Sequence, residues 1–281
     1  LVEDKVSLLA SVRISPLGPE FSVARTLAGG ALDSLSRTRA LAYDAFAKVK
    51  WLVDADNTFS FSLFNSLDAY SYCYGGYSDE KMGWGNLVIN ARHEGRLEGG
   101  WTMEDGLSYN RFSNHQGVIR DMSGTVNNLA IVSSLDELAA EAVFIKGISR
   151  DAKLRLGARE RLAWFNPGTS STFKGEGPLM TLDSPRSDHV SHSSITSLHA
   201  QYDVQVWKWF SMMAAARLDT HLADRAGSSR VKFNVNPGLS LMARMDLTSN
   251  VALEATADWT TQYYHTLEGA DDMPAHFKSS L

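Results

Sequence analysis

Apolar and polar residues alternate one by one over long stretches of this chain. From Val251 to Trp259 every second residue is apolar, and the residues between them are small or polar. Successive side chains of a β-strand point to opposite faces, so such a segment has one apolar face and one polar face. The pattern therefore predicts an all-β chain built from amphipathic strands.

Eleven such strands are predicted, the first at about Lys5–Ile14 and the last at Val251–Trp259. The sixth, at about Ser134–Ile148, is less clearly marked, because Leu138–Glu141 is also compatible with the start of a helix. Antiparallel strands that follow one another along the chain need only short connections between them.

Short and long connections alternate along the whole chain. The short ones include the Asp- and Asn-rich turn after Val53, which suits a hairpin. This alternation is typical of outer-membrane barrels, which have short turns on the periplasmic side and long loops outside. The predicted long loops are Ser15–Ala40, Asp68–Lys81, Ser113–Ser133, Asn166–Ser193 and His221–Ser229.

Composition is compatible with a barrel and excludes some other classes. The formal net charge of −5 and the 21% of charged residues argue against a nucleic-acid binder. The mean hydropathy is −0.20, and no apolar run is long enough for a membrane helix. A barrel strand needs only every second residue to be apolar, so its mean hydropathy is near zero.

A soluble β-sandwich or a lipocalin-like barrel also shows alternation. Strands of soluble proteins are mostly about five or six residues long, whereas several strands predicted here reach about ten. The tryptophans also fall near strand ends, with Trp51 and Trp101 toward short turns and Trp164 toward a long loop. Aromatic residues in such positions form the interfacial girdles of membrane barrels, so a transmembrane β-barrel is the preferred interpretation.

Three segments carry a resemblance to a known family. The segments are Met82-Gly83-Trp84-Gly85-Asn86, the run Pro237-Gly238-Leu239-Ser240-Leu241-Met242-Ala243-Arg244, and Gln262-Tyr263-Tyr264-His265-Thr266-Leu267. Their order and spacing, together with the strand pattern, are similar to the middle and late barrel of TonB-dependent outer-membrane receptors, over nearly the whole chain.

The resemblance implies a 22-stranded barrel in the bacterial outer membrane, plugged by an N-terminal domain and driven by the TonB complex. No plug domain or TonB-box region precedes the first predicted strand, and eleven strands are half of the expected number. We therefore expect residues 1–281 to be a single β-barrel domain that is part of a larger barrel. An open half-barrel would leave unpaired edges in lipid, so we expect a plug domain or another barrel-completing chain as a partner.

Two groups of residues are candidates for ligand binding. Tyrosines in the predicted external loop Asp68–Lys81 offer aromatic faces to a sugar or a flat ligand, or else belong to the outer aromatic girdle. These are Tyr70, Tyr72, Tyr74 and Tyr77. Basic residues on the polar face of the seventh strand, which would line the lumen, are suited to anionic cargo or to the acidic parts of a plug. These are Lys153, Arg155, Arg159 and Arg161.

The sequence offers little for catalysis, and we expect neither an enzyme nor a bound cofactor. Asp188, His189 and His192 are too loosely spaced for a metal site, and Ser194 near them is a weak candidate for a nucleophile. Cys73 is the single cysteine, which rules out an internal disulfide. The expected function is energised uptake of a scarce nutrient, with outer-membrane lipid and the TonB complex as partners. The alternative is a non-transporting barrel subunit that scaffolds a larger surface complex.

Overall fold

The computed structural model describes residues 5–15, 17–29, 39–74, 78–122, 125–173, 190–225 and 228–261. Eleven strands form one antiparallel sheet in which each strand pairs with the next along the chain. A short helix, α1 (Leu17–Leu27), lies between the first two strands. The strands are β1 (Val6–Ser15), β2 (Arg39–Leu52), β3 (Asn57–Tyr74), β4 (Ser78–Leu97), β5 (Trp101–Met122), β6 (Thr125–Gly147), β7 (Ala152–Phe173), β8 (Ser191–Trp207), β9 (Phe210–Arg225), β10 (Ser228–Thr248) and β11 (Val251–Trp259).

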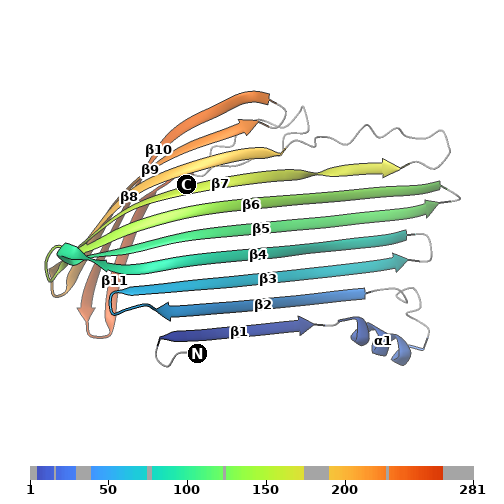
Figure 1. Cartoon of the computed structure of the whole chain (residues 1–281), viewed down its shortest axis with the longest axis horizontal. Helices are drawn as coiled ribbons and strands as arrows, with labels where there is room; N and C mark the ends of the chain where they lie inside the picture. The colour runs from blue at the N-terminus through green and yellow to red at the C-terminus, as the bar shows by residue number, and fades with distance from the viewer. Residues whose placement is uncertain are drawn as a thin grey trace.

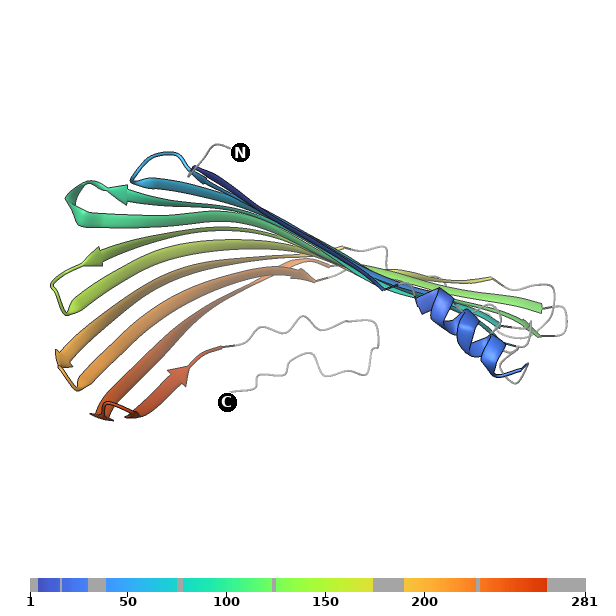
Figure 2. The ribbon, with the colours of Figure 1, turned by 90° about the horizontal axis from the view of Figure 1, so that it is seen from below.

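The short turns lie together at one end of the sheet, and α1 lies at the other end (Figures 1 and 2). Five hairpins end there: β2–β3, β4–β5, β6–β7, β8–β9 and β10–β11. The β4–β5 turn contains the 3-10 helix η2 (Glu98–Gly100), in which Gly99 and Gly100 adopt positive φ angles that a glycine tolerates without strain. The predicted short turns therefore lie together at one end of the sheet (Figure 1).

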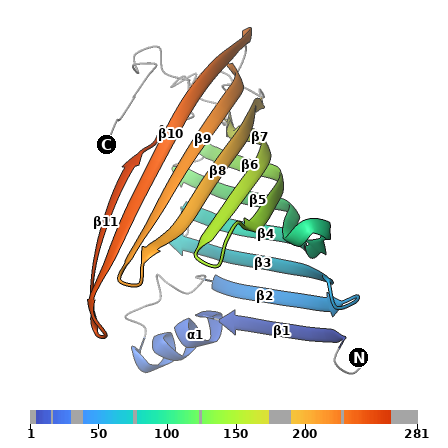
Figure 3. The same cartoon turned by 90° about the vertical axis from the view of Figure 1, so that its left-hand side faces the viewer.

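The sheet is curved, and it turns from β1 to β11 (Figure 3). In the part of the chain that the structure describes, β1 and β11 form its two edges and do not pair with each other. The curvature gives the sheet a convex face and a concave face. Eleven antiparallel strands in one sheet is the arrangement that the sequence predicted.

The two faces differ in chemistry. Most of the buried side chains lie on the concave face; they are Ser66, Ala139, Ile145, Ser193, Ile195, Ser197 and His221, whereas the buried Ala152 lies on the convex face at the start of β7. The opposite, convex face carries exposed Phe, Leu, Val and Trp side chains along most of the strands. On β8 this shows residue by residue, since Leu198 on the convex face is 54% exposed and Ser197 on the concave face is 3% exposed.

The strands are staggered along the sheet. A row of paired residues that starts at Trp51 on β2 passes through Asp105 on β5 and reaches Leu218 on β9. β2 ends one residue past Trp51, but β5 begins four residues beyond this row, at Trp101, and β9 begins eight residues beyond it, at Phe210. A steady shift of this kind is the shear that accompanies strand tilt in a barrel.

Several segments predicted as long loops are strands, and those predictions were wrong. Most of Asp68–Lys81 belongs to the β3–β4 hairpin, and most of Ser113–Ser133 to the β5–β6 hairpin. β7, β8, β9 and β10 likewise extend into Asn166–Ser193 and His221–Ser229. Both faces of these extensions carry polar residues, so the alternation fades although the backbone hydrogen-bond ladder continues.

The correction changes the structural context of the tyrosine candidates. Tyr70, Tyr72 and Tyr74 lie in strand β3 rather than in a loop, and Tyr77 lies outside the described residues. The segment Gln262–Leu267 lies outside them as well. The sixth strand, in contrast, is confirmed, since β6 runs through the stretch for which a helix start was the alternative.

Asp54 organises the β2–β3 turn. Its Oδ1 accepts hydrogen bonds from the backbone N–H groups of Asp56 and Asn57, both at 2.8 Å, and from the Asn57 side-chain amide at 2.9 Å. The backbone N–H of Asp56, followed by the Asn57 amide, holds the pKa of Asp54 below its usual value, because these donors favour the ionised carboxylate. The lowered pKa means that this contribution to stability is present above the unfolded-state pKa and is lost as the pH falls.

We predict that Asp54→Ala lowers the urea midpoint of the folded protein at pH 7, and that the difference from the unaltered chain shrinks as the pH falls below about 4. Urea unfolding in lipid vesicles, followed by tryptophan fluorescence at several pH values, measures this. Asp56→Ala is the control, because Asp56 takes part in the turn through its backbone N–H, and its carboxylate makes only an exposed 3.7 Å ion pair with Arg96. Equal midpoints for Asp54→Ala and Asp56→Ala at pH 7 would contradict the assignment.

Candidate functional site

The concave face of β4 to β9 carries several charged groups that the strands bring together. On β7, alternation places Arg155, Arg159 and Arg161 on this face. The register aligns Arg159 with Glu141 of β6 and with Ser197 of β8. Positive and negative side chains are thus interspersed across neighbouring strands, which limits like-charge repulsion.

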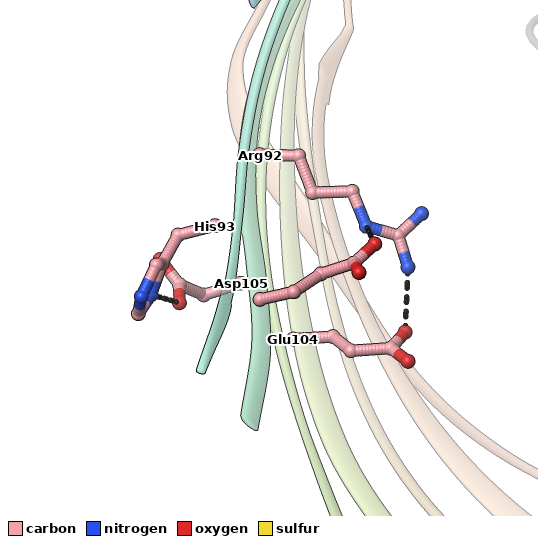
Figure 4. A network of polar contacts seen from close by, with 5 residues as sticks. Arg92, His93, Glu104 and Asp105 are labelled. Atoms are coloured by element: carbon pink, nitrogen blue, oxygen red, sulfur yellow. Dashed lines mark hydrogen bonds and ion pairs between the residues drawn. The ribbon is translucent and has the colours of Figure 1, made fainter. Parts of the chain in front are cut away.

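Arg92 of β4 links two carboxylates at one side of this face. Its guanidinium lies 2.6 Å from Glu104 of β5 and 3.3 Å from Glu94. Figure 4 shows Arg92 and Glu104 on one side of the strands, and His93 and Asp105 on the other. Because Arg92 is 47% exposed, each ion pair contributes only about 0–1 kcal/mol, so their main effect is to fix where the charges lie.

A hollow of about 220 Å³ lies beside this network. Arg92, Glu104, Glu141 and Arg159 line it, and Gly106 leaves its floor free of a side chain. Two guanidinium groups and two carboxylates therefore surround a space of a few water molecules. Such a lining suits a small zwitterion or an ordered group of water molecules.

A larger hollow of about 450 Å³ lies between β7 and β10, lined by Arg161, His199, Arg217 and Asp219. Asp219 accepts a hydrogen bond of 2.6 Å from Arg217 Nε, and Ser197 Oγ accepts one of 3.0 Å from Arg217 Nη2. These two bonds hold the guanidinium of Arg217 in place. The arrangement offers fixed cationic donors to an anion or a polar segment on the concave side.

Gly157 leaves the space that the ring of His199 occupies. This ring lies over Gly157 of β7, and a Cβ at Gly157 would be 2.2 Å from the ring carbon Cε1. Only a residue without a side chain leaves room for the imidazole there. Gly157 thus brings His199 into the lining of the larger hollow.

The three predicted arginines have different surroundings. Arg161 Nε lies 3.6 Å from Glu137, and Arg155 Nε is buried with no hydrogen-bond partner among the described residues. Arg159 forms no ion pair within the described part of the chain. The structure places all three on the concave face, and their binding of a ligand stays a prediction.

Tyr70 and Tyr72 also lie on the concave face of β3. The rings of Tyr70 and Tyr72 are stacked, with centroids 6.4 Å apart and an angle of 12° between the planes. The β3–β4 register places Tyr70 opposite Met82, next to Trp84 on the same face of β4. Tyr70 is 39% exposed and Trp84 is 40% exposed. An aromatic surface is therefore available, although ligand binding by these tyrosines stays a prediction.

The weaker candidates for metal binding and catalysis contact other side chains or lie outside the described residues. Asp188 and His189 lie outside them. His192 Nδ1 lies 2.8 Å from Asp224 of β9, and Ser194 Oγ donates a 2.6 Å hydrogen bond to Glu160 of β7. Within the described ranges, no three His, Cys, Asp or Glu side chains form a group that could hold a metal ion.

Several residues of the concave face were missed at the level of the sequence, namely Arg92, Glu104, His199, Arg217 and Asp219. Each occupies a polar position of a predicted strand, so alternation alone assigns it to the correct face. Which of them meet depends on strand register and on the position of Gly157, neither of which the alternation specifies.

None of the helices in the described part of the chain is long and apolar enough to cross a membrane. No protein-family model matches the chain, and no curated protein matches it.

Solved structures do resemble the chain. The open form of the ferric-catecholate import receptor Fiu from E. coli K12 gives a TM-score of 0.62 at 9% identity, over 94% of this chain and 51% of that one. Its closed form gives 0.60 at 9% identity, over 93% and 47%. The iron transporter FrpB from Neisseria meningitidis gives 0.54 at 10% identity, over 80% and 37%.

These similarities concern the fold. The chain has the fold of an outer-membrane β-barrel wall and spans about half the length of Fiu. The predicted fold class is therefore confirmed, whereas membership of the TonB-dependent family stays a prediction.

We predict that Asp219→Asn makes Arg217 more reactive toward phenylglyoxal, because the variant loses the charged partner that holds the guanidinium. Peptide mass spectrometry after limited modification of the folded protein measures the rate at each arginine. Asp224→Asn is the matched control, since Asp224 contacts His192 instead. An unchanged rate at Arg217 in Asp219→Asn would show that this contact does not shield the guanidinium.

Proposed function

We propose that this chain forms part of the wall of an outer-membrane barrel that takes up a scarce nutrient in an energy-dependent way. The observation that carries the proposal is the opposite chemistry of the two faces of one curved, staggered sheet. The convex face exposes large apolar side chains, and the concave face carries arginines and carboxylates. A membrane barrel requires this division between a lipid-facing surface and a polar interior.

The height of the apolar strip supports the membrane location. On the convex face of β2, apolar or aromatic residues run from Trp51 through Tyr43 to Leu41. The ten residue steps from Trp51 to Leu41 span about 33 Å along the strand, or about 25 Å along the membrane normal at a tilt of about 40°. This agrees with the apolar band of about 25 Å that encircles outer-membrane barrels.

Aromatic residues at the short-turn end agree with an interfacial girdle. The rings of Trp51 and Phe59 are 6.4 Å apart, and those of Trp207 and Trp209 are 5.2 Å apart. Lys146 Nζ lies 5.2 Å from the ring centroid of Trp101. In an outer-membrane orientation this end faces the periplasm, and the opposite end of the sheet extends to the cell exterior.

The transport role rests on the concave face and on the likeness to receptor barrels. The charged hollows and the exposed rings of Tyr70 and Trp84 give this face groups that bind polar and flat molecules. We propose a barrel of about 22 strands, to which this chain contributes eleven, with a plug domain on the concave side and the TonB complex as the source of energy. Fiu imports ferric catecholate and FrpB transports iron, so an iron chelate is one cargo to test first.

We predict that an arginine on the convex face is far more costly than one on the concave face of the same strand. Leu63→Arg on the convex face of β3 places a charge near the middle of the apolar strip. It should lower the free energy of unfolding by about 2–4 kcal/mol. Its neighbour Ser62→Arg faces the interior and costs less than about 1 kcal/mol. Urea unfolding of both variants in phospholipid vesicles measures the difference. Equal costs for the two would contradict a lipid-facing convex surface.

We predict that a strain lacking the gene grows poorly when a single nutrient is scarce and normally when the same nutrient is abundant. Growth with limiting ferric chelates, haem, glycans or peptides, with and without loss of TonB, measures this. Loss of TonB should add nothing to the defect for the nutrient concerned. A strain without any nutrient-specific defect would contradict the transport role.

The alternative function, a scaffold for a larger surface complex, is favoured by the length of the central strands. β5 continues from Arg111 at the outer end of the apolar strip to Met122, paired with β6 over its full length. Such an extension is a firm surface outside the membrane. Co-purification of several unrelated proteins with the chain, without a nutrient-specific growth defect, would favour the scaffold.

A further inference from the structure

The convex face contains a hollow of about 530 Å³ near the outer end of the apolar strip. Gly83 and Gly85 of β4 and Ala69 of β3 form its floor, because they carry little or no side chain. Larger apolar side chains rise around this floor, among them Leu41, Leu67 and Val132. The result is an apolar trough along β4, open to the surroundings of the sheet.

Close packing of β4 against β3 explains why glycines form the floor of the trough. A Cβ at Gly85 would lie 3.0 Å from the carbonyl oxygen of Ser66, and a Cβ at Gly83 would lie 3.3 Å from that of Asp68. Both distances are short, so a side chain at either position would push against the backbone of β3. The trough is therefore a consequence of strand packing at the two glycines.

Two cations lie at the outer end of the trough. Arg39 of β2 and Lys81 of β4 flank Ser71 of β3 in one row of the sheet, and all three line the hollow. Arg39 and Lys81 are exposed, and neither forms an ion pair within the described residues. No Asp or Glu contributes to the lining. The hollow thus joins an apolar trough to an uncompensated positive end.

The distance of these cations from the short-turn end indicates their depth in a membrane. Arg39 lies twelve residues along β2 from Trp51, which is next to the short turn. That separation is about 40 Å along the strand and about 30 Å along the membrane normal at a tilt of about 40°. The hydrocarbon core of a bilayer is about 30 Å thick, so Arg39 lies at the level of the outer headgroups. The stagger of the strands places Lys81 somewhat farther out, and the wall of the trough at Leu41 and Leu67 lies on the hydrocarbon side of both cations.

We propose that this hollow binds one anionic, phosphate-bearing lipid of the outer leaflet. An acyl chain lies in the trough over Gly83 and Gly85, and the headgroup phosphate lies between Arg39 and Lys81. Charge complementarity selects an anionic amphiphile, because a purely apolar occupant would leave the two cations without a partner and a free anion would leave the trough uncovered. The inference rests on the proposed location of the chain in a membrane.

The test uses a photoactivatable phosphatidic acid that carries a diazirine in its acyl chain. The full chain is inserted into phosphatidylcholine vesicles containing a small fraction of this probe, and the cross-linked residues are identified by mass spectrometry. We expect the cross-links to concentrate on the walls of the trough, at and beside Leu41, Leu67 and Val132. Unlabelled phosphatidic acid should compete, whereas extra phosphatidylcholine or inorganic phosphate should not.

Two variants and their controls separate the parts of the site. Arg39→Gln combined with Lys81→Gln should lower cross-linking at the trough on the order of fivefold or more, since both headgroup contacts are lost. Ala69→Leu should lower it by filling the floor. The controls are Lys48→Gln, on the concave face, and Ala47→Leu, on the convex face outside the trough, and both should leave the cross-links unchanged.

The outcomes distinguish the lipid site from the membrane location on which it rests. Cross-links spread evenly along the convex face, or unaffected by the double variant, would overturn the lipid site and leave the membrane location standing. A chain that does not insert, with no cross-links on the convex face at all, would overturn both. Competition by inorganic phosphate would replace the lipid by a free anion as the ligand.

Discussion

The register between neighbouring strands is the constraint on which the rest of the structure depends. In every hairpin, residues of the same face stand opposite each other, from Trp51 with Phe59 to Leu241 with Ala257. A slip of one residue in any pair would move the whole apolar set of a strand to the polar face. The pairing from β1 to β11 therefore keeps most large apolar side chains on the convex face and the arginine clusters on the concave face, with the His93–Asp105 pair as a polar exception on the convex face.

The same register assembles the candidate sites. Arg92 stands opposite Gly106 and reaches Glu104, two residues away on the same face, and Arg217 stands opposite His199 and reaches Ser197 in the same way. The stagger of the strands follows from the same pairing. Glycines then shape the surface that the register provides. Gly157 makes room for His199 on the concave face, and Gly83 and Gly85 form the floor of the convex trough. The charged groups of the concave face and the hollows on both faces therefore depend on the same strand pairing.

The sequence predicted this pattern well where one face is apolar. β11 has the predicted bounds, and Arg155, Arg159 and Arg161 share the predicted face, because alternation directly reports which side of a strand meets water. The prediction failed at Asp68–Lys81, where both faces are polar and a continuing strand looks like a loop. The hollows could not be predicted from the sequence, because they depend on which residues of separate strands stand side by side.

The account is tested most directly by spin labels at consecutive positions from Phe59 to Leu67 in β3, in vesicles, after replacement of the native cysteine by Cys73→Ser. Relaxation by oxygen reports lipid exposure, and relaxation by a nickel complex reports water exposure. The account predicts strict alternation, with oxygen dominant at odd-numbered positions and nickel dominant at even-numbered ones. Nickel accessibility at all positions, without alternation, would contradict a sheet that separates lipid from a polar interior.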